Sequence, residues 1–119
     1  MIANIRYTDD IKPPFSATTF AWFIRIKPEK KGDEPLLAHE MTHVEQFWRN
    51  PLGLIWYKIS KKYRLRSELE AYIAQLACYH LSERDAKAWQ FAGFLSTRYG
   101  LDITQGAAKL LLIAIKNNA

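Results

Sequence analysis

The sequence has little of several features that would place it in a specialised class of protein. Its 119 residues include one cysteine, Cys78, so no disulfide can form within the chain and nothing indicates an oxidising compartment. No apolar run approaches the roughly 20 residues that a membrane-spanning helix needs. The first residues lack the basic and then apolar pattern of a secretory signal peptide. We therefore expect a cytoplasmic protein with no membrane partner.

Repeats, low-complexity segments and long linkers are also missing, which predicts a single domain over residues 1–119. Hydrophobic residues make up 49% of the chain and charged residues 24%, as in folded rather than disordered proteins. The formal net charge is +5, and basic residues gather most densely in KISKKYRLR, residues 58–66. We interpret this cluster as a solvated face, because no nucleic-acid-binding motif accompanies it. Binding of nucleic acid or of an acidic partner is the less favoured alternative.

The apolar pattern changes along the chain from that of strands to that of helices. Residues 18–27, TTFAWFIRIK, are rich in β-branched and aromatic residues and predict a strand, and residues 3–8 predict a shorter one. Helical periodicity and end signals then predict helices over about residues 35–50, 55–61, 65–81, 82–100 and 103–116. The predicted fold class is therefore α+β: a small N-terminal antiparallel β element followed by four or five helices.

The segment LLAHEMTHVEQFWR, residues 36–49, carries the most specific chemistry, and it lies on one of these predicted helices. His39 and His43 are four residues apart, so a helix places them on one face, one turn apart. Two imidazoles in this arrangement can bind one zinc ion. Glu40 is turned about 100° from His39, so it can flank the metal as general base for a zinc-activated water. Two ordinary histidines beside a solvated glutamate are the alternative.

A catalytic zinc site needs a third protein ligand and one open position. The metzincin motif would take that ligand from the same helix, but Gln46 and Arg49 stand where it requires Gly and His. The next long helix offers Glu68 and Glu70, of which only one can face the metal. Glu68 is slightly favoured because it lies beside apolar residues on the inward face. His80, farther along the same predicted helix, is a weaker candidate.

The pattern of His39, Glu40 and His43, followed by Glu68 in ELEAY, resembles the gluzincin zinc metallopeptidases. In that group the third ligand is the glutamate of a Glu-x-x-Ala pattern on the helix after HExxH, and Glu68 to Ala71 matches it. The resemblance covers about residues 18–77, and it is closest to very short bacterial and phage proteins that keep little beyond this motif. FAWFIRI, residues 20–26, resembles the edge strand that pairs with extended substrate in these enzymes.

The resemblance implies a zincin-like catalytic core with a zinc cofactor. His39, His43 and Glu68 would be its ligands, Glu40 the catalytic base, and a peptide or protein the substrate. Larger gluzincins complete the substrate cleft with a second domain, for which 119 residues leave no room. The alternative is therefore a zinc-binding regulatory or interaction module that hydrolyses nothing. A basic nucleic-acid-binding protein ranks last.

Supporting side chains are less well determined. Ligating histidines usually donate their second N–H to a carboxylate or a carbonyl. Glu45, Glu70 and the backbone are the candidate acceptors. Tyr72, one turn after Glu68, is expected in the core, and donation to an oxyanion is its alternative role.

Overall fold

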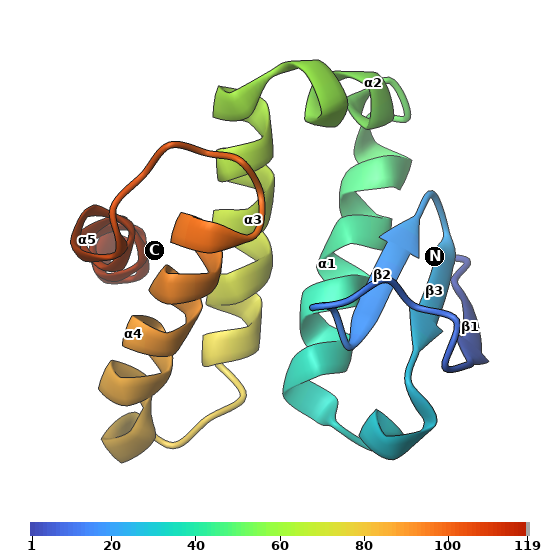
Figure 1. Cartoon of the computed structure of the whole chain (residues 1–119), viewed down its shortest axis with the longest axis horizontal. Coiled ribbons are helices and arrows are strands. Elements are labelled where there is room, and N and C mark those ends of the chain that lie inside the picture. Colours follow the sequence, from blue (N-terminus) through green and yellow to red (C-terminus); the bar gives the residue numbers. More distant parts are fainter. Residues whose placement is uncertain (119) are drawn as a thin grey trace.

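The predicted α+β class is confirmed. A computed structural model describes the backbone of residues 1–118 and the side chains of residues 1–114. In this part of the chain a three-stranded sheet comes first and five α-helices follow (Figure 1). The sheet packs beside the first helix, and α3, α4 and α5 (Lys61–Leu76, Leu81–Thr97 and Gln105–Asn118) lie on the other side of that helix.

The sheet has the order β1-β3-β2 and is mixed. We expected an antiparallel element, and antiparallel pairing is found between β2 (Ala17–Phe20) and β3 (Phe23–Ile26), which both come from the segment predicted as one strand. β1 (Asn4–Tyr7), the second predicted strand, instead pairs parallel with β3. The single strand predicted over residues 18–27 is wrong, because a turn at Ala21 divides it into a hairpin. Ala21 has a φ of 54°, a conformation that usually marks glycine or asparagine, so the sequence carries no turn signal there.

The helix that carries the HExxH segment begins and ends near its predicted bounds. α1 spans Glu34–Arg49, and the side chain of Asp33 accepts a hydrogen bond from the Leu36 amide at 3.1 Å, as an N-cap does. Pro35 occupies the first turn, where its missing N–H costs nothing. Pro51 follows Asn50 directly and disfavours continuation of the helix.

The second long helix, α3 (Lys61–Leu76), runs antiparallel to α1 after the short α2 (Gly53–Ile59) (Figure 1). The prediction that this helix extends to residue 81 is wrong. Its end is set by Arg84, whose guanidinium donates to the carbonyls of Ala77 and Tyr79 and draws the chain out of helical geometry.

Two further helices, α4 (Leu81–Thr97) and α5 (Gln105–Asn118), pack on α3. None of the helices in the described part of the chain has the length and apolar character needed to cross a membrane.

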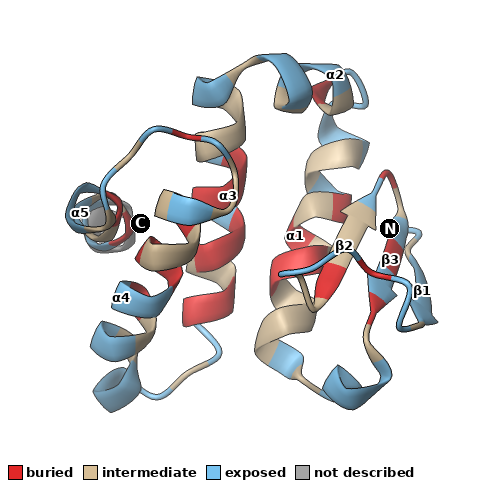
Figure 2. Cartoon of the chain, viewed as in Figure 1, coloured by how far each residue is buried: buried red, intermediate tan, exposed pale blue. Residues whose placement is uncertain are grey.

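The core consists of two clusters on either side of the α1–α3 contact. One lies between the sheet and α1, and the other joins α3, α4 and α5 (Figure 2). The buried members of the first are Ala17, Ile24, Ile26 and Val44. Those of the second are Leu69, Tyr72, Leu76, Ala88, Phe91, Ala92, Leu95, Leu101, Ala108 and Leu112. The polar residues buried between α1 and α3 are therefore held from both sides by apolar packing.

Leu95 and Leu110 offer a matched test of this core, since both lie inside helices but are 0% and 70% exposed. We expect Leu95→Ala to lower the free energy of unfolding by about 2–5 kcal/mol, because it leaves a cavity. Leu110→Ala should change it by less than about 0.5 kcal/mol. Urea denaturation of the two variants measures the difference. Equal losses would contradict the assignment of the core.

Candidate metal centre

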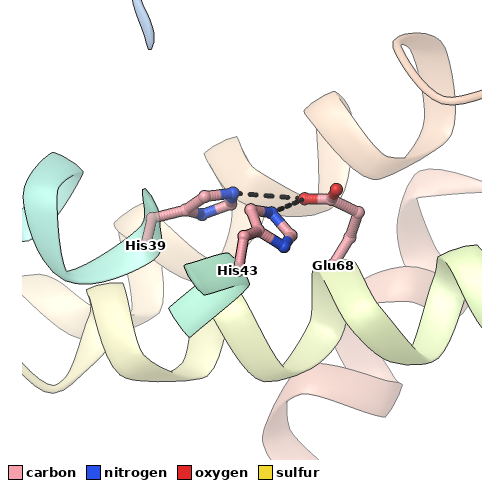
Figure 3. Close-up of side chains that lie close together, drawn as sticks. All are labelled: His39, His43 and Glu68. Carbon is pink, nitrogen blue, oxygen red and sulfur yellow. Dashed lines mark hydrogen bonds and ion pairs between the residues drawn. The ribbon is translucent and has the colours of Figure 1, made fainter. Parts of the chain in front are cut away.

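The structure brings together the three residues predicted as metal ligands. His39 and His43 project from successive turns of α1, and Glu68 reaches toward them from α3 (Figure 3). The Nε2 atoms of His39 and His43 lie 3.1 and 3.2 Å from the same atom, Oε1 of Glu68. One donor atom from each of the three residues lies within 4.8 Å of the others. His39 and Glu68 are 4% and 2% exposed, so this is a buried group rather than a surface cluster.

The two rival candidates lie elsewhere. Glu70 is exposed and accepts a hydrogen bond from Nη2 of Arg49 at 2.5 Å, so it forms a surface ion pair. His80 is exposed at the N-cap of α4, because α3 ends before reaching it. Of the alternatives left open by the sequence, Glu68 is therefore the carboxylate at the histidine pair.

Each histidine is oriented by a glutamine, and not by Glu45, Glu70 or the backbone, which were the candidates that the sequence left open. Nδ1 of His39 lies 3.0 Å from Oε1 of Gln75, and Nδ1 of His43 lies 2.9 Å from Oε1 of Gln46. The Gln46 amide has a fixed orientation, since its Nε2 donates to the Ser67 carbonyl and its Oε1 accepts from the Ser67 hydroxyl. An Nδ1–H that donates to an amide oxygen leaves the Nε2 lone pair free, as a metal ligand requires.

Helical spacing could have identified Gln75, which follows Glu68 by two turns on the same face of α3. The sequence interpretation missed it because it considered only carboxylates and backbone groups as partners. Of the expected partners, Glu45 is exposed and Glu70 pairs with Arg49.

The charges at the centre favour a positive ion between the three side chains. Burial by itself would raise the pKa of Glu68, but the adjacent histidines hold it well below its usual range. Burial by itself would lower the pKa of His43, but the carboxylate of Glu68 raises it to about 9. The hydroxyl of Tyr57, from α2, donates to Oε2 of Glu68 at 2.5 Å and fixes the second oxygen of the carboxylate. A proton or a metal cation thus completes the charge balance at the two Nε2 atoms.

Glu40 lies beside this group without being a member of it. Its side chain is 5% exposed, and Oε2 is 3.8 Å from Nε2 of His39. Oε1 accepts a hydrogen bond from the Thr19 hydroxyl at 3.0 Å, so strand β2 holds the carboxylate in place. The sequence predicted the flanking position of Glu40 from its turn on the helix, but not the contact with Thr19.

A pocket of about 490 Å³ opens directly onto the centre. Its floor is formed by His39, Glu40, His43 and Glu68, and its walls come from β2, α1, α2 and α3. Tyr72 does not line it and lies in the core as expected, with its ring 4.4 Å from that of His39. The four polar residues are therefore accessible to a small molecule or to a chain segment that enters the pocket.

The donor set of two imidazole nitrogens and one carboxylate oxygen fits a zinc ion, with room on the pocket side for a further ligand. Comparisons of the chain with protein families, with curated proteins and with solved structures find no match. The functional conclusion therefore depends on the chain's own residues.

Glu68 and Glu70 provide a matched pair of substitutions on α3. We expect the wild-type protein and Glu70→Gln to bind about one zinc ion per chain. Glu68→Gln should weaken zinc binding by more than about 100-fold, because it removes a ligand rather than a supporting contact. Competition with a zinc chelator measures the affinities. Equal affinity of the two variants would exclude Glu68 as a ligand.

Gln75→Leu tests the orientation of His39. The substitution leaves the Nδ1–H of His39 without its acceptor in a buried site, so we expect zinc affinity to fall by about 10–100-fold. The cobalt-substituted protein should also show a shifted visible spectrum, because the imidazole loses its fixed orientation. An unchanged affinity and spectrum would mean that Gln75 does not support the ligand.

Proposed function

We propose that the protein is a zinc-dependent metallopeptidase. In this proposal His39, His43 and Glu68 hold zinc, and Glu40 is the general base. The observation that carries the proposal is the position of Glu40, which is buried beside the His-His-Glu group, held by Thr19 and open to the pocket. A purely structural zinc site has four protein ligands and needs neither a flanking carboxylate nor an open side.

Zinc, when bound, would make a water molecule more acidic and would polarise the carbonyl of a peptide bond. The protein's own side chains transfer the proton and position the imidazoles. Oε1 of Glu40 is occupied by the Thr19 hydroxyl, so Oε2 is the oxygen available to accept a proton from the attacking water. The same carboxylate can then deliver that proton to the leaving amine nitrogen. Gln75 and Gln46 keep the imidazoles fixed during both transfers.

The edge of the sheet supports an extended peptide as the substrate. β2 is an edge strand, since only β3 pairs with it, and its residues Thr18, Thr19 and Phe20 line the pocket. A peptide in the pocket can therefore pair with the free backbone groups of β2. This position differs from the sequence interpretation, which assigned the edge role to residues 20–26. Most of that segment forms β3, the central strand.

Glu40→Gln separates metal binding from catalysis. We expect the variant to bind zinc as the wild type does and to lose about 10²–10⁴-fold in peptide hydrolysis, because only the base is removed. Glu45→Gln, an exposed change on the same helix, is the matched control and should retain activity. Cleavage of a peptide library with zinc and with a chelator measures both.

Hydrolysis by Glu40→Gln at the wild-type rate would refute the role of Glu40. A wild-type protein that binds zinc but gives no chelator-sensitive cleavage would favour the zinc-binding module instead.

A further inference from the structure

The metal centre lies where two pockets meet. The second pocket, of about 250 Å³, extends from the centre toward α4. Both pockets are lined by Phe15, Ala17, His39, Glu40, Arg98 and Tyr99. A substrate that reaches Glu40 from either side therefore also reaches Arg98 and Tyr99.

Arg98 is a half-buried cation at this junction without an anionic partner. It lies at the C-cap of α4, and its guanidinium carbon is 3.7 Å from the centre of the Phe94 ring. The centre of the Phe15 ring lies 5.9 Å from the same guanidinium carbon. Among the residues whose side chains the structure describes, no carboxylate lies within ion-pair distance of Arg98. The contact with the Phe94 ring holds the guanidinium by a cation–π interaction and uses none of its N–H groups.

Arg64 also lines the first pocket, but its guanidinium has a structural role. Its Nε donates to the backbone carbonyl of Tyr99, and its Nη1 donates to those of Tyr57 and Lys58, so most of its donors are used within the fold. Arg98 has no comparable acceptors in the described part of the chain. Its donors are therefore free to bind a ligand.

The anionic groups that line the two pockets are already engaged by the protein. Glu68 binds the two histidines and Tyr57, Glu40 accepts from Thr19, and Asp33 caps α1. The basic residues that line the pockets outnumber these carboxylates. They are Lys30, Lys58, Arg64, Lys87 and Arg98. The surroundings of Arg98 thus favour an incoming anion.

A second donor lies beside Arg98. The hydroxyls of Tyr72 and Tyr99 are 2.7 Å apart, and one hydrogen suffices for the bond between them. The other phenolic hydrogen has no protein acceptor in the described part of the chain. Tyr72, Tyr99 and Arg98 all line the second pocket, so the hydroxyl pair and the guanidinium belong to the lining of one cavity.

We propose that Arg98, with the Tyr72–Tyr99 hydroxyl pair, binds a substrate carboxylate next to the metal centre. A planar guanidinium and a hydroxyl donor match the two oxygens of a carboxylate. The carboxylate belongs to the C-terminus of the peptide or to an acidic side chain near the cleaved bond. This inference rests on the proposed peptidase function and specifies its class of substrate.

The test measures peptide binding separately from cleavage. Zinc-loaded Glu40→Gln protein holds the peptide uncut, and four five-residue peptides are titrated into it by calorimetry. All four have an acetylated N-terminus: one has uncharged side chains and a free C-terminal carboxylate, one is its amide, and two are amides with a central glutamate or a central glutamine. We expect at least one of the carboxylate peptides to bind about 10-fold or more tightly than its neutral partner. The preferred member identifies the source of the carboxylate.

The Arg98→Gln substitution in the same background should abolish this preference. Arg66→Gln, which removes the same charge from an exposed position on α3, should leave it intact. Zinc content and circular dichroism check that each variant is folded and loaded. If Arg98→Gln fails to fold, Arg98→Lys replaces it. Lysine keeps the charge without the planar fork and should reduce the preference without abolishing it.

Equal binding of all four peptides, or a preference that keeps its full size in Arg98→Gln or Arg98→Lys, would overturn the carboxylate site even if the wild type cleaves peptides. A preference that depends on Arg98, in a wild-type protein that gives no chelator-sensitive cleavage of the peptide library, would refute the peptidase proposal and retain the carboxylate site.

Discussion

The contact between the Glu68 carboxylate and the two histidines is the constraint around which the rest of the molecule is arranged. It joins α1 and α3 through one oxygen atom in a buried position. Burial of a carboxylate is costly unless every lone pair finds a partner. Here the Tyr57 hydroxyl donates to one oxygen of the carboxylate, and a proton or a metal cation at the two imidazole Nε2 atoms would satisfy the other. Every buried polar side-chain atom in the described residues has a partner within hydrogen-bond distance. The antiparallel packing of α1 on α3 brings the Glu68 carboxylate to the two imidazoles.

Each remaining element has a definite relation to that contact. The sheet covers α1 and supplies Thr19, which holds Glu40. α2 supplies Tyr57 and one wall of the pocket. α4 and α5 close the core behind α3 and place Arg98 and Tyr99 at the far side of the centre. A small fold can thus form a cleft from loops and short elements, although it has no second domain among its described residues.

Much of the centre was predictable from the sequence because helical spacing determines direction. His39 and His43 had to share a face, Glu40 had to flank them, and Glu68 was the more inward of two glutamates. The features that sequence reasoning missed depend on contacts between distant segments. Gln75 meets His39 only after α1 and α3 pack. Its spacing from Glu68 places it on the same face of α3, but that spacing does not show which residue of α1 it contacts.

Two element boundaries were predicted wrongly for the same reason, because each depends on contacts with another segment of the chain. The turn at Ala21 contains no glycine, asparagine or proline, so the sequence does not indicate it. The pairing of β2 with β3 favours the positive φ of Ala21. The end of α3 is set by Arg84 from the next helix, so local propensity alone extends the helix too far and places His80 on it. The α+β class survived both errors, because it depends on the change of periodicity and not on where each element stops.

Arg64 connects the two sides of the cleft through a single side chain. From α3 it holds the carbonyl of Tyr57 on one side and that of Tyr99 on the other. The residue that fixes Glu68 and the residue beside Arg98 are therefore fastened to the same guanidinium. Loss of the Arg64 guanidinium would therefore remove a hydrogen-bond donor from both walls of the cleft at once.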